Sequence, residues 1–255
     1  MTFITAPKNN LRNIYQVFVD CDISVERLIS KTFTLGAELL SDKELQSGSV
    51  LIDLGYEKIS IGLFKNLAIV HSMTFPFGIN HIAKDISKVC LLNLDESENI
   101  KNNFDYSFKN NKDIFDENDF LKNNFFVSSK FRKISKKLII NVIKERLDEI
   151  IEKIKKQLIV PGLGLNSGAK YILTGEGSNL INLERYFSNF FGNNVKKISN
   201  NLDQDSGSEN NFTACLGAIK IIKDGWETEA IPKISDKNIK KLNFLDKIFK
   251  IYRQN

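Results

Sequence analysis

Histidine, cysteine and proline are scarce in this chain of 255 residues, which holds two, three and four of them respectively. The two histidines, His71 and His81, give little support to a histidine-based catalytic triad or a multi-histidine metal centre. The cysteines at positions 21, 90 and 215 lie far apart and form no C-x-x-C pair, which argues against a disulfide framework and a zinc site. We assign no metal ligand and no catalytic residue, and we expect the cysteines to be reduced core residues of a cytosolic protein.

Long apolar runs are also missing. No window approaches the twenty apolar residues of a membrane-spanning helix, and the opening MTFITAPKNN lacks the basic region and apolar run of a signal peptide.

Most of the chain has no excess of charge either. Residues 237–255 hold six of the 36 bases and one of the 31 acids, so the other residues have thirty of each. This balance argues against a nucleic-acid partner.

The segment 237–255 combines an apolar stripe with a basic face. Its apolar residues recur at helical spacing, and they include Ile239, Leu242, Leu245, Ile248, Phe249 and Tyr252. The other face carries bases that include Lys240, Lys247 and Lys250. This composition predicts an amphipathic helix that lies on an anionic membrane, and the polar residues 224–236 before it, with Pro232, predict a linker. The alternative is a helix packed on its own domain.

The rest of the chain alternates between strand and helix patterns. We predict a strand over 2–6, helices over 10–21 and 34–40, and a polar turn over 41–49. Three β-rich runs between Val50 and Phe77 predict a meander, followed by a helix from Ile79. A long helix over 134–158 has a predicted buried stripe of Leu138, Val142, Leu147, Ile150, Ile151 and Ile154. A strand over 171–174, a helix from about Leu180 and a closing helix over 212–222 complete the pattern.

Two turns have the composition of a ligand site. The first, Asp53-Leu54-Gly55, places a carboxylate at a strand end, where it can hold hydrated Mg²⁺, and a glycine that lets backbone N–H groups approach phosphate. The second, Gly175-Glu176-Gly177-Ser178, lies between a strand and a helix and favours the phosphates or sugar of a nucleotide. Each glycine also has an ordinary explanation, which is a backbone that needs positive φ.

The order of these motifs resembles the actin-like ATPase superfamily, and within it the FtsA family of bacterial division proteins. VLIDLGYEKISIGLF is similar to the second phosphate segment of that family, YILTGEGSNLINL to its adenosine segment, and FTACLGAIKI to its closing helix. SENIK, with Glu98 and Lys101, is similar to the stretch that reaches adenine and ribose, and the segment 237–255 is similar to the membrane-targeting sequence. The resemblance implies an α/β fold of the actin/Hsp70 ATPase superfamily, specifically its second half with an inserted subdomain.

The resemblance also implies ligands and partners. ATP with Mg²⁺ is the implied cofactor, and the implied nucleotide-binding residues are Asp53, Gly55, Glu98, Lys101, Gly175, Gly177 and Ser178. The implied partner is the C-terminal tail of FtsZ, which would dock on the inserted subdomain near Arg146 and Lys153. The implied function is to tether FtsZ filaments to the cytoplasmic face of the inner membrane at the division site and to help assemble the septum. Self-association into filaments is also implied.

Two departures from the family pattern change these expectations. The family continues its first segment as D-x-G-G-G-T, whereas Tyr56, Glu57 and Lys58 follow Gly55 here. The chain also opens inside what would be the family's extra polymerisation subdomain, as in a truncated or split protein. We therefore expect weak ATP binding at most and no appreciable ATPase activity.

The expected organisation has five parts. Residues 1–47 would be a remnant of the first half, 48–94 with 166–223 the nucleotide-side subdomain, 95–160 the inserted subdomain, 224–236 a linker and 237–255 the membrane helix. Two other functions share the fold. One is a PilM-like pilus assembly protein, and the other is a fragment of a sugar-kinase or heat-shock type ATPase.

Overall fold

The structure is a computed structural model that describes residues 4–107, 119–126, 132–159, 169–192, 194–198 and 212–224. The chain divides into two compact units, and the described part of the first is Thr5–Ile29. This unit contains helix α1 (Lys8–Asp20), which follows Pro7 and has no buried residue. The helix predicted over 10–21 is therefore confirmed, with an earlier start. The strand predicted over 2–6 does not form in its described residues, 4–6.

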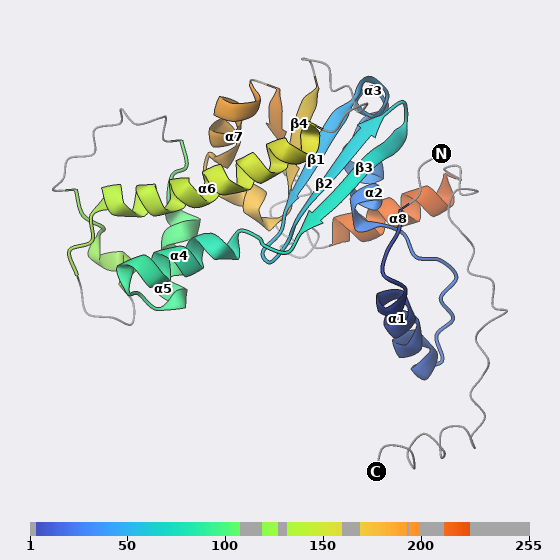
Figure 1. Cartoon of the computed structure of the whole chain (residues 1–255), viewed down its shortest axis with the longest axis horizontal. Coiled ribbons are helices and arrows are strands. Elements are labelled where there is room, and N and C mark those ends of the chain that lie inside the picture. The colour runs from blue at the N-terminus through green and yellow to red at the C-terminus, as the bar shows by residue number, and fades with distance from the viewer. Residues whose placement is uncertain are drawn as a thin grey trace, which may run out of the picture. The chain divides into compact units, whose positions relative to one another are not determined.

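The second unit, Ser30–Trp226 with residues 2–4, is built on a five-stranded sheet (Figure 1). The strands are β1 (Ser49–Leu54), β2 (Ile59–Lys65), β3 (Ala68–Phe75), β4 (Lys170–Thr174) and β5 (Val195–Lys197). They lie in the order β3-β2-β1-β4-β5. The first three form the predicted antiparallel meander, while β1, β4 and β5 run parallel to one another. Asp53 of β1 lies opposite Thr174 of β4, so the two strands end at the same edge.

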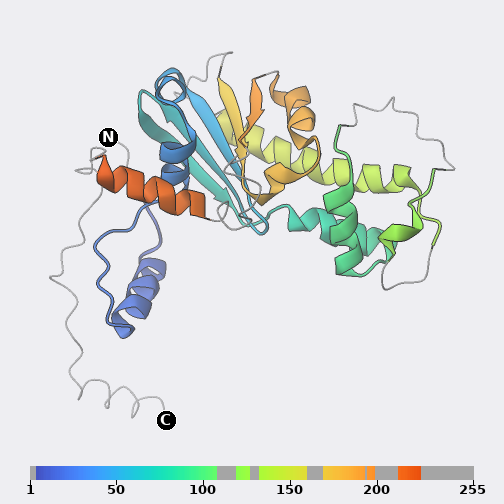
Figure 2. The ribbon, with the colours of Figure 1, turned by 180° about the vertical axis from the view of Figure 1, so that it is seen from behind.

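Helices cover both faces of this sheet, as the two opposite views show (Figures 1 and 2). On one face α2 (Lys31–Leu39) packs against α8 (Thr213–Lys223), and Leu51 and Phe64 of the sheet belong to the core on that side. On the other face Ile52 and Ile61 join the larger core, which includes residues of α6 (Lys136–Leu158) and α7 (Leu183–Phe191). Alternate residues of β1 therefore enter different cores, as the two-residue repeat of a strand requires.

In its described residues the connection from β3 to β4 is mainly helical. It contains α4 (Asn80–Cys90), α5 (Leu94–Asn103), a short 3-10 helix η1 (Asn123–Phe125) and α6, and α4 packs against both α5 and α6. A second 3-10 helix, η2 (Glu176–Asn179), follows β4. The long helix from 134, the helix from 79 and the closing helix are confirmed, each to within a few residues.

Three further predictions are wrong. The turn expected over 41–49 contains helix α3 (Asp42–Ser47), which Ser41 and Glu44 cap. In the first half of α6 the buried positions are Ile139, Ile140 and Ile143, whereas Leu138 is exposed and Val142 only half-buried. Of the three cysteines, Cys90 alone is buried, and Cys21 and Cys215 are exposed.

Candidate functional site

The two glycine-containing turns meet at the edge where β1 and β4 end. Gly175 has φ +84°, and a Cβ built on it would lie 2.4 Å from Asp53 Oδ1 and 2.9 Å from the carbonyl oxygen of Leu54. Only glycine combines that backbone conformation with so close an approach. The structure therefore brings Asp53 and Gly175 together, and ligand sites in α/β proteins commonly lie at this edge of a parallel sheet.

The small residues that follow have structural partners of their own. A Cβ on Gly177 would lie 2.6 Å from Cγ2 of Ile79 and 2.9 Å from the Leu54 carbonyl oxygen, so glycine is needed for η2 to pack on the end of β1. The buried hydroxyl of Ser178 donates a hydrogen bond to the carbonyl oxygen of Gly175 at 2.7 Å. Close packing within the chain thus accounts for the residue types at 175, 177 and 178.

Asp53 is buried and already has a cationic partner. Lys31, the first residue of α2, donates a hydrogen bond from Nζ to Asp53 Oδ2 at 2.7 Å, and the lysine side chain is exposed. Sequence reasoning missed Lys31. Lys31 and Asp53 are 22 residues apart in the sequence, which is too far for a local sequence pattern to indicate their ion pair.

Glu98 and Lys101 lie beside the tip of the β1–β2 hairpin. The Tyr56 hydroxyl donates to Glu98 Oε1 at 3.1 Å, and Lys101 Nζ forms an ion pair with Glu98 and lies 5.3 Å from the centroid of the Tyr56 ring. The hydrogen bond to Glu98 raises the pKa of the Tyr56 phenol, with further contributions from the charge of Glu98 and from burial. The phenol therefore stays a donor at neutral pH. No feature of the sequence indicated that Tyr56 would contact Glu98 and Lys101, although the sequence did show a bulky residue after Gly55.

A nucleotide with Mg²⁺ does not fit these residues as they stand. The Asp53 carboxylate is paired with Lys31, and the two side chains expected at ribose and adenine are paired with each other beneath Tyr56. Among the described residues no cluster of three His, Cys, Asp or Glu side chains could hold a metal ion. The expected nucleotide residues are thus gathered at one edge, but their polar groups already have partners within the chain.

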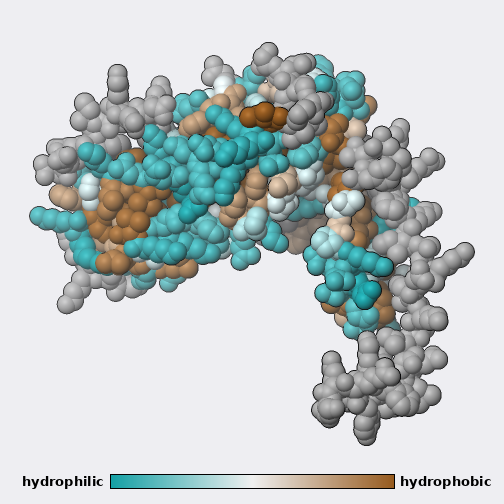
Figure 3. All heavy atoms as spheres, viewed as in Figure 1, coloured by the Kyte–Doolittle hydropathy of each residue, from teal (hydrophilic) through white to brown (hydrophobic). Residues whose placement is uncertain are grey.

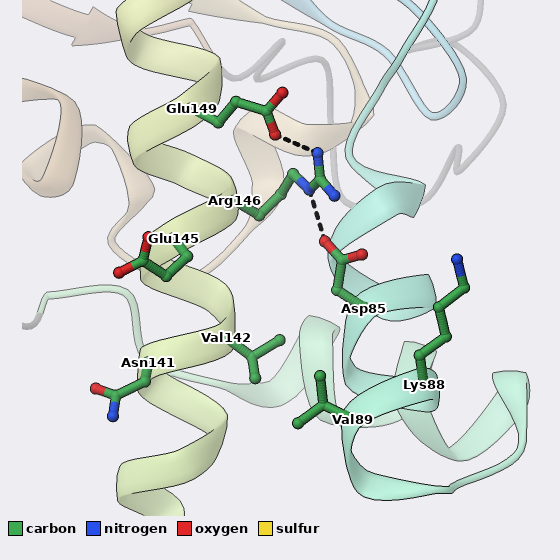
Figure 4. A pocket seen from close by; sticks show the side chains of 8 residues that line it. All are labelled: Asp85, Lys88, Val89, Asn141, Val142, Glu145, Arg146 and Glu149. Atoms are coloured by element: carbon green, nitrogen blue, oxygen red, sulfur yellow. Dashed lines mark hydrogen bonds and ion pairs between the residues drawn. The ribbon is translucent and has the colours of Figure 1, made fainter.

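A groove lies between α4 and α6, on the helical connection (Figure 4). It has a volume of about 570 Å³ and is lined by Asp85, Lys88, Val89, Asn141, Val142, Glu145, Arg146 and Glu149. Arg146 Nε donates to Asp85 Oδ2 at 2.6 Å, and its Nη1 pairs with Glu149. The hydrogen bond to Asp85, together with both carboxylate charges, raises the pKa of Arg146 against the effect of burial. Arg146 therefore bridges the two helices and also faces the groove.

Other bases of the helical connection have partners as well. Lys153 pairs with Glu149 at 2.8 Å and lies 4.4 Å from the centroid of the Phe77 ring. Lys136 pairs with Asp119, and Arg132 donates to the carbonyl oxygen of Leu91. Lys153 does not line the groove. Arg146, Lys153 and Lys136 are thus paired with carboxylates rather than free positive charges.

Exposed apolar side chains occur at the end of α4, at the start of α5 and near the start of α6. Val89, Leu91, Leu94 and Leu138 are all exposed, with Leu91 at 74%. Figure 3 shows an apolar patch over this end of the α4–α6 connection, bordered by hydrophilic atoms. The groove therefore combines the apolar side chains of Val89 and Val142 with charged side chains.

Solved structures with a similar fold belong to actin-like proteins. MreB 5 of Spiroplasma citri bound to AMPPNP aligns with a TM-score of 0.65 and 17% identity, covering 88% of this chain and 68% of that chain. A MamK filament aligns with a TM-score of 0.58 and 16% identity, covering 85% of this chain and 65% of that one. The fold is therefore actin-like, as predicted, although the expected C-terminal amphipathic helix lies outside the described residues.

Sequence comparison gives the family. The family model described as cell division protein FtsA matches residues 50–217, and this chain belongs to that family. The cell division protein FtsA of Buchnera aphidicola subsp. Schizaphis graminum is 28% identical over 177 residues, which is 68% of this chain and 41% of the relative. The chain spans less than half the length of the curated relatives it matches.

The predicted membrane segment, 237–255, lies outside the described residues, as do residues 225–236 of the predicted linker 224–236. Asp224, the first residue of that linker, caps the end of α8. Within the part of the chain that is described, no helix is both long and apolar enough to cross a membrane.

Proposed function

We propose that this chain ties FtsZ filaments to the cytoplasmic face of the inner membrane and helps to assemble the division septum. The observation that carries the proposal is the match to the FtsA family over residues 50–217. The same match favours this function over the PilM-like and the sugar-kinase or heat-shock alternatives. By this proposal the α4–α6 groove takes the C-terminal tail of FtsZ, and residues 237–255 bind anionic lipid.

The groove supports the FtsZ contact through its chemistry. Val89 and Val142 offer apolar contacts, while Arg146 supplies N–H donors that match a carboxylate of an acidic tail. Because Asp85 and Glu149 already hold Arg146, an incoming carboxylate has to share or replace them. We therefore expect apolar contacts to supply most of the affinity and salt to weaken it only in part. Lys153, outside the groove, would act on the approach of the tail rather than in the bound complex.

Calorimetry with the C-terminal tail peptide of the cognate FtsZ tests this contact. Val89→Glu replaces an apolar side chain of the groove with a charged one and should weaken binding at least tenfold. Ile219→Glu is the matched control, because Ile219 is likewise an exposed β-branched residue on a helix, α8, away from the groove. Arg146 is a poor choice of variant, since its loss would also break the bridge to Asp85. If the folded chain shows no binding at low salt, the FtsZ contact is refuted and the PilM-like alternative gains support.

A nucleotide role is proposed only in outline. The edge formed by Asp53, Gly55, Gly175 and Gly177, with Glu98 and Lys101 beside it, corresponds to the site where the family resemblance places ATP and Mg²⁺. The MreB 5 structure that shares the fold was solved with AMPPNP. We propose that this edge is a nucleotide site derived from that arrangement, without ATPase activity in this chain alone. Self-association into filaments, as in the MamK structure, stays a prediction.

A further inference from the structure

The tip of the β1–β2 hairpin carries an aromatic ring that lies against an ion pair between the buried Lys101 and the partly exposed Glu98. The Tyr56 ring lies with its face 5.3 Å from Lys101 Nζ, and its hydroxyl is bonded to Glu98. Lys101 belongs to α5 and is completely buried, whereas Tyr56 is 39% exposed. Tyr56 therefore lies between solvent and the buried Lys101. Their contact joins two parts of the chain that are 45 residues apart in the sequence.

The environment of Lys101 is unusual for a lysine. An ammonium group has three N–H donors and is costly to bury unless it is paired and hydrogen-bonded. Among the described residues its contacts are the Glu98 carboxylate and the Tyr56 ring face, and Nζ has no hydrogen bond beyond that ion pair. A cation held against a ring face is attracted by the ring, but the ring accepts no ordinary hydrogen bond. The pair therefore retains donors and acceptors that a polar ligand could use if the ring were absent.

The position of this pair fits a ligand site. It lies beside the tip of the β1–β2 hairpin, because Tyr56 at that tip contacts both Glu98 and Lys101. Gly175 and Gly177 bring η2 against the same end of β1. Removal of the Tyr56 ring would thus leave Lys101 and Glu98 facing outward at the edge where parallel strands end.

We propose that Tyr56 is an internal plug, whose ring occupies the place of a nucleoside over Lys101 and Glu98 and keeps this site shut. The proposal rests on the nucleotide site proposed above and names the residue that closes it. A purine is planar like the phenol ring and can lie over an ammonium, and ribose hydroxyls can bond to a carboxylate and an ammonium. The Tyr56 hydroxyl bonded to Glu98 imitates one such contact.

Calorimetric titration of the full chain with ATP and with ADP tests the plug. Tyr56→Ala should bind at least one of them tenfold or more tightly than the unmodified chain does. Tyr56→Phe keeps the ring and should behave as the unmodified chain. Glu57→Ala, a substitution at the neighbouring tip residue, is the matched control and should also change nothing. Adding Lys101→Met to Tyr56→Ala should abolish the gain. Tyr56→Ser serves as a second opening variant if the alanine variant has a lowered melting temperature.

The outcomes separate this proposal from the others. Equal affinity of the unmodified chain and Tyr56→Ala would overturn the plug, and so would the absence of binding to both. In either case, retained binding of the FtsZ tail peptide by Tyr56→Ala would leave the proposed division function standing. Loss of the tail contact in the unmodified chain, together with a gain of nucleotide binding in Tyr56→Ala, would refute that contact and support the plug.

Discussion

Gly175 and Gly192 adopt almost the same backbone conformation in different surroundings. Their φ values are +84° and +80°, and both have ψ near 180°, a region that only glycine occupies at low cost. A Cβ on Gly175 would overlap the end of β1, whereas a Cβ on Gly192 would meet nothing within 4 Å. A substitution at Gly192 therefore measures the free-energy cost of the backbone conformation alone, whereas one at Gly175 adds the cost of steric overlap.

Gly175→Ala should destabilise the chain more than Gly192→Ala. The backbone cost is about 1–3 kcal/mol for each variant, and overlap with Asp53 and Leu54 should add about 1–3 kcal/mol to Gly175→Ala alone. Urea unfolding of the two variants measures the difference in the free energy of unfolding. Equal losses would mean that η2 does not need its close approach to β1.

Helix α3 is stabilised both by a local capping box and by a contact with strand β4. The Ser41 hydroxyl accepts from the Glu44 backbone N–H, and Glu44 accepts in return from the Ser41 backbone N–H at 3.0 Å, which is a capping box. Burial alone would raise the pKa of Glu44, but the hydrogen bonds from Ser41 and from Lys170 of β4 outweigh it and lower the pKa. This contribution to stability is present above the ordinary pKa of the carboxyl and is lost as pH falls through the lowered value.

Ser41→Ala should lower the free energy of unfolding by about 1 kcal/mol at neutral pH, because it removes the N-cap acceptor. Ser47→Ala is the matched control on the same helix. The Ser47 hydroxyl is exposed and donates to the Lys43 carbonyl oxygen, so its loss should change stability by less than about 0.5 kcal/mol. Denaturant titration of both variants makes the comparison, and equal effects would show that the capping box contributes nothing measurable.

The whole molecule combines a folded unit, which carries the groove, with a basic apolar segment at 237–255. The net charge of +5 is located entirely in that segment. By the proposed function the two parts do different work, since one would contact protein and the other lipid. Charge and apolar residues in the segment should act together, because each base near an anionic surface adds on the order of 1 kcal/mol while the apolar stripe enters the interface.

Phe249→Glu should abolish sedimentation with anionic liposomes even though every lysine is kept, because it places a charge within the apolar stripe. A chain ending at Asp236 should also stay in solution. Asn243→Glu is the matched control, since at helical spacing position 243 lies among the bases opposite the stripe, and it should still sediment. High salt or neutral lipid should weaken the binding of the intact chain. If all variants sediment alike, the segment is not the membrane anchor.

The sequence by itself determined several of the main elements and the family. The meander, the strand over 171–174 and the closing helix follow from residue periodicity, which depends only on neighbours two to four positions away. The capping box of α3 was also local, as S-x-x-E, and was missed because the polar residues around it resemble a turn. In α6 the sequence offered Leu138, Ile139 and Ile140 in a row, so periodicity left open which of them would face the core. The order of the motifs was enough to give the FtsA family, which the family match confirms.

The tertiary structure decided which side chains have partners. Lys31 meets Asp53, Tyr56 meets Glu98, and Arg146 meets Asp85 across 22, 42 and 61 residues respectively. Such pairs depend on how strands align and how helices pack, and no local pattern encodes them. At the predicted nucleotide edge, these contacts leave the Asp53 and Glu98 carboxylates already paired. On the predicted basic surface, they leave Arg146 paired with a carboxylate. The physical reason is that a local sequence pattern specifies which groups are present, whereas packing specifies which of them remain available to a ligand.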